Sequence, residues 1–288
     1  MTPQSYALHI GLNAVNPGSY EGWNGELFAC ENDAAVYRSI AEKAGFRQIY
    51  SLLTKEATAV NVLQHLQTAA GQLAAGDIFL MTYSGHGGVL ADTNKDETNN
   101  FGEMDGFDET WCLYDRQLID DELFACFGQF KEGVRILLFS DSCHSGSVAK
   151  NTAPVNNNAP VDPATYTRAR FAPLGTLIRT YNAHKAEYDS IQAPLNTRPE
   201  DIKAYVVQFG ACQDDELAME VWGNGKFTAK LQKVLNEPVN SYNELFSAIK
   251  RGFSAEQHPN LFHYGNKTYE FLSQAPFSIA SNADVKAE

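Results

Sequence analysis

The sequence has no long apolar run and no paired cysteine motif. No apolar segment approaches the eighteen residues of a membrane-spanning helix, and the N-terminus lacks the basic region of a secretory signal. The five cysteines are scattered without a CxxC pair, which argues against a disulfide framework and against a structural zinc site. These absences favour a cytoplasmic protein in a reducing compartment.

Basic charge is also scarce. Lys and Arg number 22 against 35 Asp and Glu, a formal net charge of −13. Nucleic acids and anionic membranes bind basic surfaces, so neither is expected as a partner. Residues 92–122 hold eleven acidic side chains against Lys95 and Arg116. Such a run is usually a solvated loop, although it could also hold a hard cation or attract a basic substrate.

Glycine-rich phosphate loops are missing as well. Neither GxGxxG nor GxxxxGK[ST] occurs, which argues against a cofactor-binding α/β enzyme. What the chain does have is an alternation of short apolar runs with helical patterns, which favours an α/β fold with helices on both faces of a mainly parallel sheet. The expected strands are 6–13, 47–54, 78–85, 134–141 and 204–211, and the expected helices are 31–45, 58–73, 120–130, 226–236 and 241–253.

The length of 288 residues fits one domain, 1–288. Residues 151–200 hold six of the eleven prolines and show little periodicity, so we expect a surface excursion rather than a second domain. The polar C-terminal tail is expected to fray. For the first helix, Asn32 or Asp33 is the expected N-cap, and Thr58 is the candidate for the second.

Two strong strands end in unusual motifs, YSGHGG (83–88) and FSDSCHSGS (139–147). If these strands are neighbours, His86 and Cys143 face each other at the carboxyl edge of the sheet, where parallel sheets bind ligands. A thiolate is a nucleophile, and a nearby imidazole can take its proton. His144 is adjacent to the cysteine, but adjacent side chains on extended backbone point to opposite faces. We therefore predict Cys143 as nucleophile and His86 as general base.

The alternation of side chains along an extended strand also places an acid beside the nucleophile. Asp141 points to the side of Cys143, and Ser84 to the side of His86. A peptidase with a partly desolvated acidic pocket should prefer Lys or Arg before the cleaved bond. The other cysteines and histidines are first interpreted as structural residues.

These motifs resemble those of the metacaspases and their bacterial, orthocaspase-type relatives, a branch of the caspase-type cysteine peptidases. Further matching stretches are CENDA (30–34), DGFDETWCLYD (105–115), IDDEL (119–123), ACQDDE (211–216) and QHPNLFHYG (257–265). The resemblance implies a caspase-like three-layer sandwich with a mainly parallel six-stranded sheet. It also implies cleavage of proteins or peptides after Arg or Lys through Cys143 and His86.

The resemblance assigns further roles. The N–H groups of Gly87 and Cys143 would form the oxyanion hole that stabilises the tetrahedral intermediate. The basic substrate side chain would be held by four residues, Asp33, Ser84 and Asp141, with Cys30 at the rim.

Many metacaspases need calcium, and the family's site matches Asp108, Asp120 and Asp121. One further family ligand position is Lys150, whose ammonium group would oppose a cation or replace it by pairing with the same carboxylates. A helix start is the alternative interpretation of the two adjacent aspartates. We therefore expect no required cofactor, with calcium as an alternative that Lys150 weakens.

Three expectations concern the whole molecule. Self-cleavage is a hypothesis for the excursion, whose candidate sites are Arg168, Arg170, Arg179, Lys185 and Arg198. Because metacaspases are usually monomeric, the resemblance implies that the chain is a monomer. The alternative function is a catalytically silent caspase-like binding or scaffold domain, because a fold alone never establishes activity.

Overall fold

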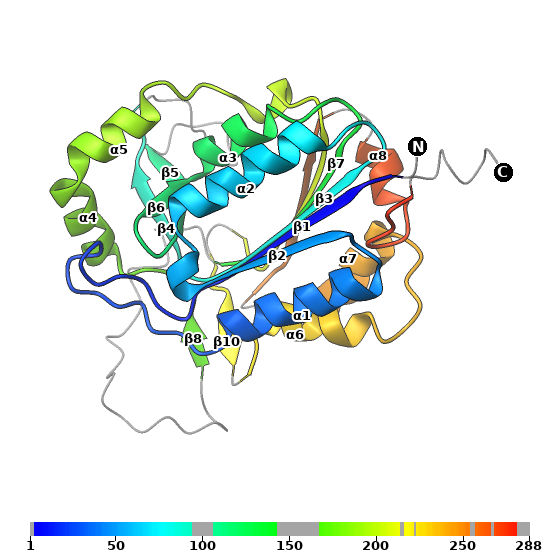
Figure 1. Ribbon diagram of the computed structural model, residues 1–288. Coiled ribbons are helices and arrows are strands. Elements are labelled where there is room, and N and C mark those ends of the chain that lie inside the picture. Colours follow the sequence, from blue (N-terminus) through cyan, green and yellow to red (C-terminus); the bar gives the residue numbers. More distant parts are fainter. Residues whose placement is uncertain are drawn as a thin grey trace.

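A six-stranded sheet forms the centre of the molecule. The computed structural model describes residues 3–93, 106–142, 167–213, 216–221, 223–253, 257–265 and 268–280. The strand order is β11-β9-β7-β3-β1-β2, and every neighbouring pair is parallel except β9 and β11. The predicted fold class, a mainly parallel six-stranded sheet with helices on both faces, is confirmed (Figure 1).

Five strands of this sheet lie where the apolar runs predicted them. They are β1 (Ser5–Gly11), β2 (Gln48–Leu53), β3 (Ile78–Ser84), β7 (Arg135–Asp141) and β9 (Tyr205–Gly210). Their side chains alternate between two cores, because successive residues of a strand point to opposite faces. Sequence patterning missed the sixth strand, β11 (Asn260–Tyr264), which has no fully buried residue and lies at the edge of the sheet.

Helices cover both faces of the sheet. α2 (Ala59–Gln72) and α3 (Asp120–Phe127) pack on one face, while α1 (Cys30–Lys43), α6 (Lys226–Val234) and α7 (Tyr242–Lys250) pack on the other (Figure 1). A short helix, α8 (Thr268–Leu272), packs beside α7 and β9. Within the described residues, no helix has the length and apolarity needed to cross a bilayer.

The two predicted N-caps had different outcomes. Thr58 caps α2, because its side chain accepts the N–H of Asn61 at 3.3 Å. The prediction of Asn32 or Asp33 as the cap of α1 is wrong, since the helix already begins at Cys30. There the Asn13 Oδ1 atom, from a distant loop, accepts the N–H of Cys30 at 3.0 Å. Asp33 is thereby free to serve another purpose in the first turn.

Other described residues form smaller elements, among them two small sheets that follow the carboxyl ends of the central strands. A three-stranded sheet comprises β4 (Gly87–Ala91), β5 (Phe107–Cys112) and β6 (Gln117–Ile119). A two-stranded sheet pairs β8 (Thr167–Ala169) with β10 (Met219–Val221). Short 3₁₀ turns occur at Thr54–Glu56 and Pro199–Asp201.

The second half of 151–200 holds more regular structure than its weak periodicity indicated. That half contains α4 (Leu174–Ala183) and α5 (Lys185–Gln192), and α4 packs on β4. The prolines had suggested an irregular segment, but Pro173 precedes α4 and Pro194 follows α5, so neither interrupts a helix. Residues 151–166 and the C-terminal tail from 281 lie outside the described residues, and the single domain stays a prediction.

A buried histidine makes the fold sensitive to acid. His9 on β1 is fully buried, its Nδ1 lies 3.1 Å from the Thr82 hydroxyl, and burial followed by the charge of Arg38 lowers its pKa to about 3. Below the unfolded-state pKa of about 6.5, His9 is protonated in the unfolded chain and stays neutral in the folded one. The free energy of unfolding therefore falls as the pH falls toward 3.

We predict that His9→Asn removes one proton's share of this dependence. The difference in unfolding free energy between wild type and variant should change by about 1.4 kcal/mol per pH unit between pH 6 and 4. Urea unfolding over that range measures it, and the value at pH 7 gives the packing cost of the substitution alone. Parallel curves for the two proteins would refute the assignment.

Candidate active site

The two motif-bearing strands end side by side. β3 and β7 are parallel neighbours, and Ser84 and Asp141 are directly opposite in their register. The condition on which the predicted pairing of His86 with Cys143 depends, that these strands are neighbours, is therefore met. The described residues stop at Ser142 on this strand, so Cys143, His144 and Lys150 lie outside them.

His86 follows β3 and is held by its backbone. Its carbonyl oxygen accepts the hydroxyl of Tyr83 at 2.7 Å and the N–H of Cys112 at 2.9 Å. Its ring centroid lies 4.8 Å from that of Trp23. Burial and then the charge of Arg170 lower the pKa of His86 to about 3, while backbone contacts with Gly25 and Phe171 oppose this shift. The imidazole is therefore neutral near pH 7 and has a lone pair free for a proton, although the lowered pKa makes it a weak base while Arg170 fills the pocket.

Three of the predicted substrate-binding residues meet around one arginine of the chain itself. Nη2 of Arg170 lies 2.7 Å from Oδ2 of Asp33, and its Nη1 lies 3.0 Å from Oδ1 of Asp141. Nη1 also donates to the hydroxyl of Ser84 at 2.8 Å. The arginine and both carboxylates are fully buried. The acidic pocket for a basic side chain that the sequence predicted is therefore present, and Arg170 of the same chain occupies it.

A third carboxylate in this pocket was missed. Oε2 of Glu220, on β10, lies 3.5 Å from Nη2 of Arg170. Sequence reasoning had no periodic signal for a single glutamate in a three-residue strand. Cys30, expected at the rim, is fully buried; its Sγ lies 3.9 Å from Oε2 of Glu220, and burial raises its pKa well above the usual range.

Backbone N–H groups at two helix starts stabilise the excess negative charge. Gly225, at the start of α6, donates to Asp33 at 3.0 Å, and Thr228 donates its N–H to Asp141 at 3.2 Å. At the start of α1, the N–H of Phe28 donates to Glu220 at 2.9 Å. Helix N-termini favour anions, so they compensate part of the charge that one arginine leaves unbalanced.

Asp141 shows the balance of these effects. Burial raises its pKa to about 6, although Arg170 lowers it and the neighbouring Asp33 raises it further. The close approach of α6 depends on Gly225, where a Cβ atom would lie 2.2 Å from Oδ2 of Asp141 and 2.5 Å from Nη1 of Arg170. Any larger residue would enter the space of the guanidinium group.

The backbone around Arg170 is bound as extended chain. Its N–H donates to the carbonyl of Ala218 at 2.9 Å, and its own carbonyl accepts the N–H of Gly87 at 2.9 Å. One residue beyond Phe171, the N–H of Ala172 donates to the carbonyl of Gly87 at 2.9 Å. Gly87 was predicted to donate its N–H to the oxyanion of a substrate. In this structure the same N–H binds the carbonyl oxygen of Arg170. We call residues 167–171 the internal segment.

The predicted calcium ligands lie on another part of this edge. Asp108 is buried on β5, and its Oδ2 accepts the side-chain amide of Gln192 at 2.7 Å. Asp120 and Asp121 are the first residues of α3, as the helix-start interpretation predicted. The described residues contain no group of three or more His, Cys, Asp or Glu side chains placed to hold a metal ion. The expectation that no cofactor is required, with calcium as the alternative, stays a prediction.

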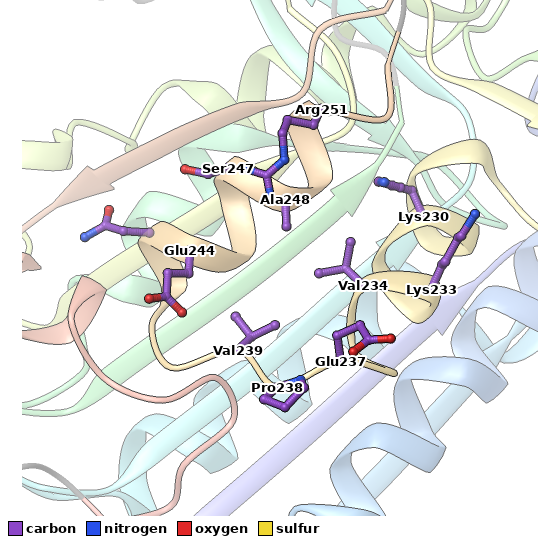
Figure 2. A pocket seen from close by; sticks show the side chains of 11 residues that line it. Lys230, Lys233, Val234, Glu237, Pro238, Val239, Glu244, Ser247, Ala248 and Arg251 are labelled. Atoms are coloured by element: carbon purple, nitrogen blue, oxygen red, sulfur yellow. The ribbon is translucent and has the colours of Figure 1, made fainter.

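An open groove lies elsewhere on the surface, between α6 and α7. It has a volume of about 610 Å³, and Lys230, Lys233 and Glu237 line one side of it while Glu244 and Arg251 line the other (Figure 2). It contains none of the residues that meet around Arg170. The internal segment already fills the acidic pocket, so this open groove and the predicted chemistry do not coincide.

Comparison with known proteins agrees with this architecture. The family profile of the caspase domain, peptidase family C14, matches residues 6–276. The chain belongs to the caspase domain family. A solved structure, protein GSU0716 from Geobacter sulfurreducens, superimposes with a TM-score of 0.84 at 42% identity, covering 96% of this chain and 99% of that one. Caspase-1 from Spodoptera frugiperda superimposes with a TM-score of 0.53 at 10% identity, covering 92% of this chain and 88% of that one, and shows the shared fold alone.

Curated relatives of this caspase domain are named metacaspases. Metacaspase-1 of Mycosarcoma maydis is 27% identical over 278 residues, which cover 85% of this chain and 66% of that protein. Metacaspase-1A of Neurospora crassa is 33% identical over 156 residues, which cover 49% of this chain and 32% of that protein. The chain thus spans between a third and two thirds of the length of these relatives. The matches support a domain of the cysteine-peptidase type.

We predict that Arg170→Ala destabilises the fold by about 3 kcal/mol at pH 8, because it leaves buried carboxylates without their counter-charge. The loss should shrink at pH 5.5, since Asp141, whose pKa is already raised to about 6, then takes up a proton. Thermal unfolding at both pH values measures the effect.

The matched control is Arg168→Ala. Arg168 pairs with Glu26 at 3.6 Å, and 43% of the glutamate side chain is exposed. Removing such a pair should cost less than about 1 kcal/mol at either pH. Equal losses for the two arginine variants would contradict the importance of the buried pocket.

Proposed function

We propose that this caspase domain is a cysteine endopeptidase that cleaves peptide bonds after Arg or Lys. The observation that carries the proposal is the placement of Arg170. Its side chain lies buried among carboxylates, and its carbonyl oxygen accepts the N–H of Gly87 next to His86. A substrate with a basic residue before the cleaved bond would use the same contacts.

The proposed chemistry follows from these positions. His86 takes the proton of the Cys143 thiol, and the thiolate attacks the carbonyl carbon of the basic residue. The N–H of Gly87 stabilises the resulting oxyanion, with the N–H of Cys143 as its proposed partner. His86 then gives its proton to the leaving amine, and water hydrolyses the thioester that remains.

The shape of the pocket favours Arg over Lys. The two terminal nitrogens of a guanidinium group reach Asp33 and Asp141 separately, as those of Arg170 do, whereas an ammonium group offers one point charge. An acidic side chain would be repelled by all three carboxylates. Arg should therefore be the better substrate residue, Lys the weaker one, and Asp inactive.

We predict this order for three fluorogenic tetrapeptides that differ only in Arg, Lys or Asp before the reporter group. Arg should exceed Lys by about tenfold in kcat/KM, since the bidentate contact is lost. Cys143→Ala and His86→Ala are the controls for the dyad. Runs with added calcium and with a chelator test the metal prediction at the same time. If the Arg peptide is not cleaved either with or without calcium, the proposal is wrong.

A pocket variant separates specificity from folding. Asp141→Asn keeps the shape and removes the charge, so kcat/KM for the Arg peptide should fall by about thirtyfold, roughly 2 kcal/mol. Circular dichroism would establish that the variant is folded. Unchanged kinetics in a folded variant would remove Asp141 from the pocket.

Self-cleavage, where it occurs, should cut between Arg170 and Phe171. Among the five basic candidates in 151–200, Arg170 has its carbonyl on Gly87, while Arg179, Lys185 and Arg198 lie on or beyond α4. N-terminal sequencing of aged protein should show a fragment that begins Phe-Ala-Pro-Leu, which is absent from Cys143→Ala. A different cleavage position in the excursion would contradict the register of the internal segment.

The acidic pocket filled by the internal segment also fits the alternative of a catalytically silent binding domain, which would hold that segment without cutting it. The same peptide assay decides between the two. Protein or peptide substrates, a monomeric state and a cytoplasmic location belong to the proposal. Gel filtration tests the monomer directly.

A further inference from the structure

The internal segment has a second anchored side chain. Arg168, two residues before Arg170, is only 14% exposed although it lies on a short strand near the surface. Its Nη1 donates to the backbone carbonyl of Glu26 and lies 3.6 Å from Oε2 of the same residue. Its guanidinium carbon lies 5.5 Å from the ring centroid of Phe28.

These partners belong to a different part of the chain from those of Arg170. Glu26 and Phe28 lie on the loop before α1, outside the cluster of Asp33, Asp141 and Glu220. The loop is nevertheless fixed relative to that cluster, because the N–H of Phe28 donates to Oε1 of Glu220 at 2.9 Å. The spacing between the two arginine sites is therefore set by the protein.

The backbone of the segment gives these side chains their register. β8 pairs with β10 in antiparallel orientation, with Ala169 opposite Met219 and Thr167 opposite Val221. Residues two apart on extended backbone point to the same side, so Arg168 and Arg170 both face the protein. A peptide bound in the same way would place the side chain two positions before its cleaved residue against Glu26 and Phe28.

We propose that Glu26 and Phe28 form a second specificity site, which makes the preferred substrate an Arg-x-Arg sequence cut after the second arginine. This inference rests on the proposed function, because it assigns a further subsite next to the acidic pocket around Arg170. The carboxylate attracts the guanidinium group, and the phenyl ring stacks against its face. A partly exposed ion pair and a cation–π contact together favour Arg over Ala at this position by about fivefold to thirtyfold.

The test compares acetylated Thr-Arg-Ala-Arg, Thr-Ala-Ala-Arg and Thr-Glu-Ala-Arg peptides, each carrying the same fluorogenic group. The measured quantity is the ratio of kcat/KM between peptides within one protein, so the cost of displacing the internal segment cancels. The ratio of Arg to Ala should be about fivefold to thirtyfold in the wild type and fall toward one in Glu26→Gln and in Phe28→Ala. Glu26→Lys should reverse the preference toward the Glu peptide.

Glu237→Gln is the matched control, because it removes the same charge from an exposed site in the groove between α6 and α7. Its Arg-to-Ala ratio should equal that of the wild type. A ratio that falls equally in this control would indicate general attraction of a cationic peptide to an acidic protein, and would overturn the proposal.

A binding arm keeps the proposal independent of turnover. Calorimetry of Cys143→Ala with the amidated Arg and Ala peptides measures the same ratio as dissociation constants. If no peptide is cut but the Arg peptide binds more tightly, the peptidase proposal fails and the second site stands. If the peptides are cut equally well, the peptidase stands and the second site is wrong. Equal or undetectable binding without turnover would overturn both.

Discussion

The ion pairs of Arg170 with Asp33 and Asp141 connect parts of the chain that are far apart in sequence. They join the first turn of α1, the end of β7 and the segment after β8, while Ser84 adds the end of β3. All these charges are removed from water, so each has a high desolvation cost unless its partner is in place. The N-termini of α1 and α6 must therefore approach closely enough to donate to the carboxylates, and Gly225 allows it.

The sequence contained enough to predict the frame of this site. β3 and β7 are continuous apolar runs that end in polar motifs, so their positions followed from burial, and the rule for parallel sheets placed the chemistry at their carboxyl ends. Their adjacency was only a condition until the structure showed it. Asp141 followed from the period of two along an extended strand. Ser84 followed in the same way on its own strand, whereas Asp33 required the resemblance to a family, because it lies on a helix and nothing local connects it with the strand ends.

Other parts of the site depend on contacts that no local pattern reports. Glu220 approaches Arg170 only because a short strand, β10, returns beside β8. The N-cap of α1 was misassigned for a similar reason, since Asn13, on another loop, supplies the acceptor. The importance of Arg170 itself was hidden among several basic residues of one excursion. Its partners come from four separate elements, α1, β3, β7 and β10, and only their assembly distinguishes it from Arg179 or Lys185.

The two ends of the internal segment are held in different ways. Phe171 is buried in the core, and Ala172 bonds to Gly87 immediately before α4 begins. On the other side, Arg168 and Arg170 are held by side-chain contacts and by the short pairing with β10. A cut between Arg170 and Phe171 would thus leave both new ends seated where they were. Clearing the acidic pocket would then require β8 to separate from β10. Departure of the cut segment, rather than bond breaking, would in that case set access for the next substrate.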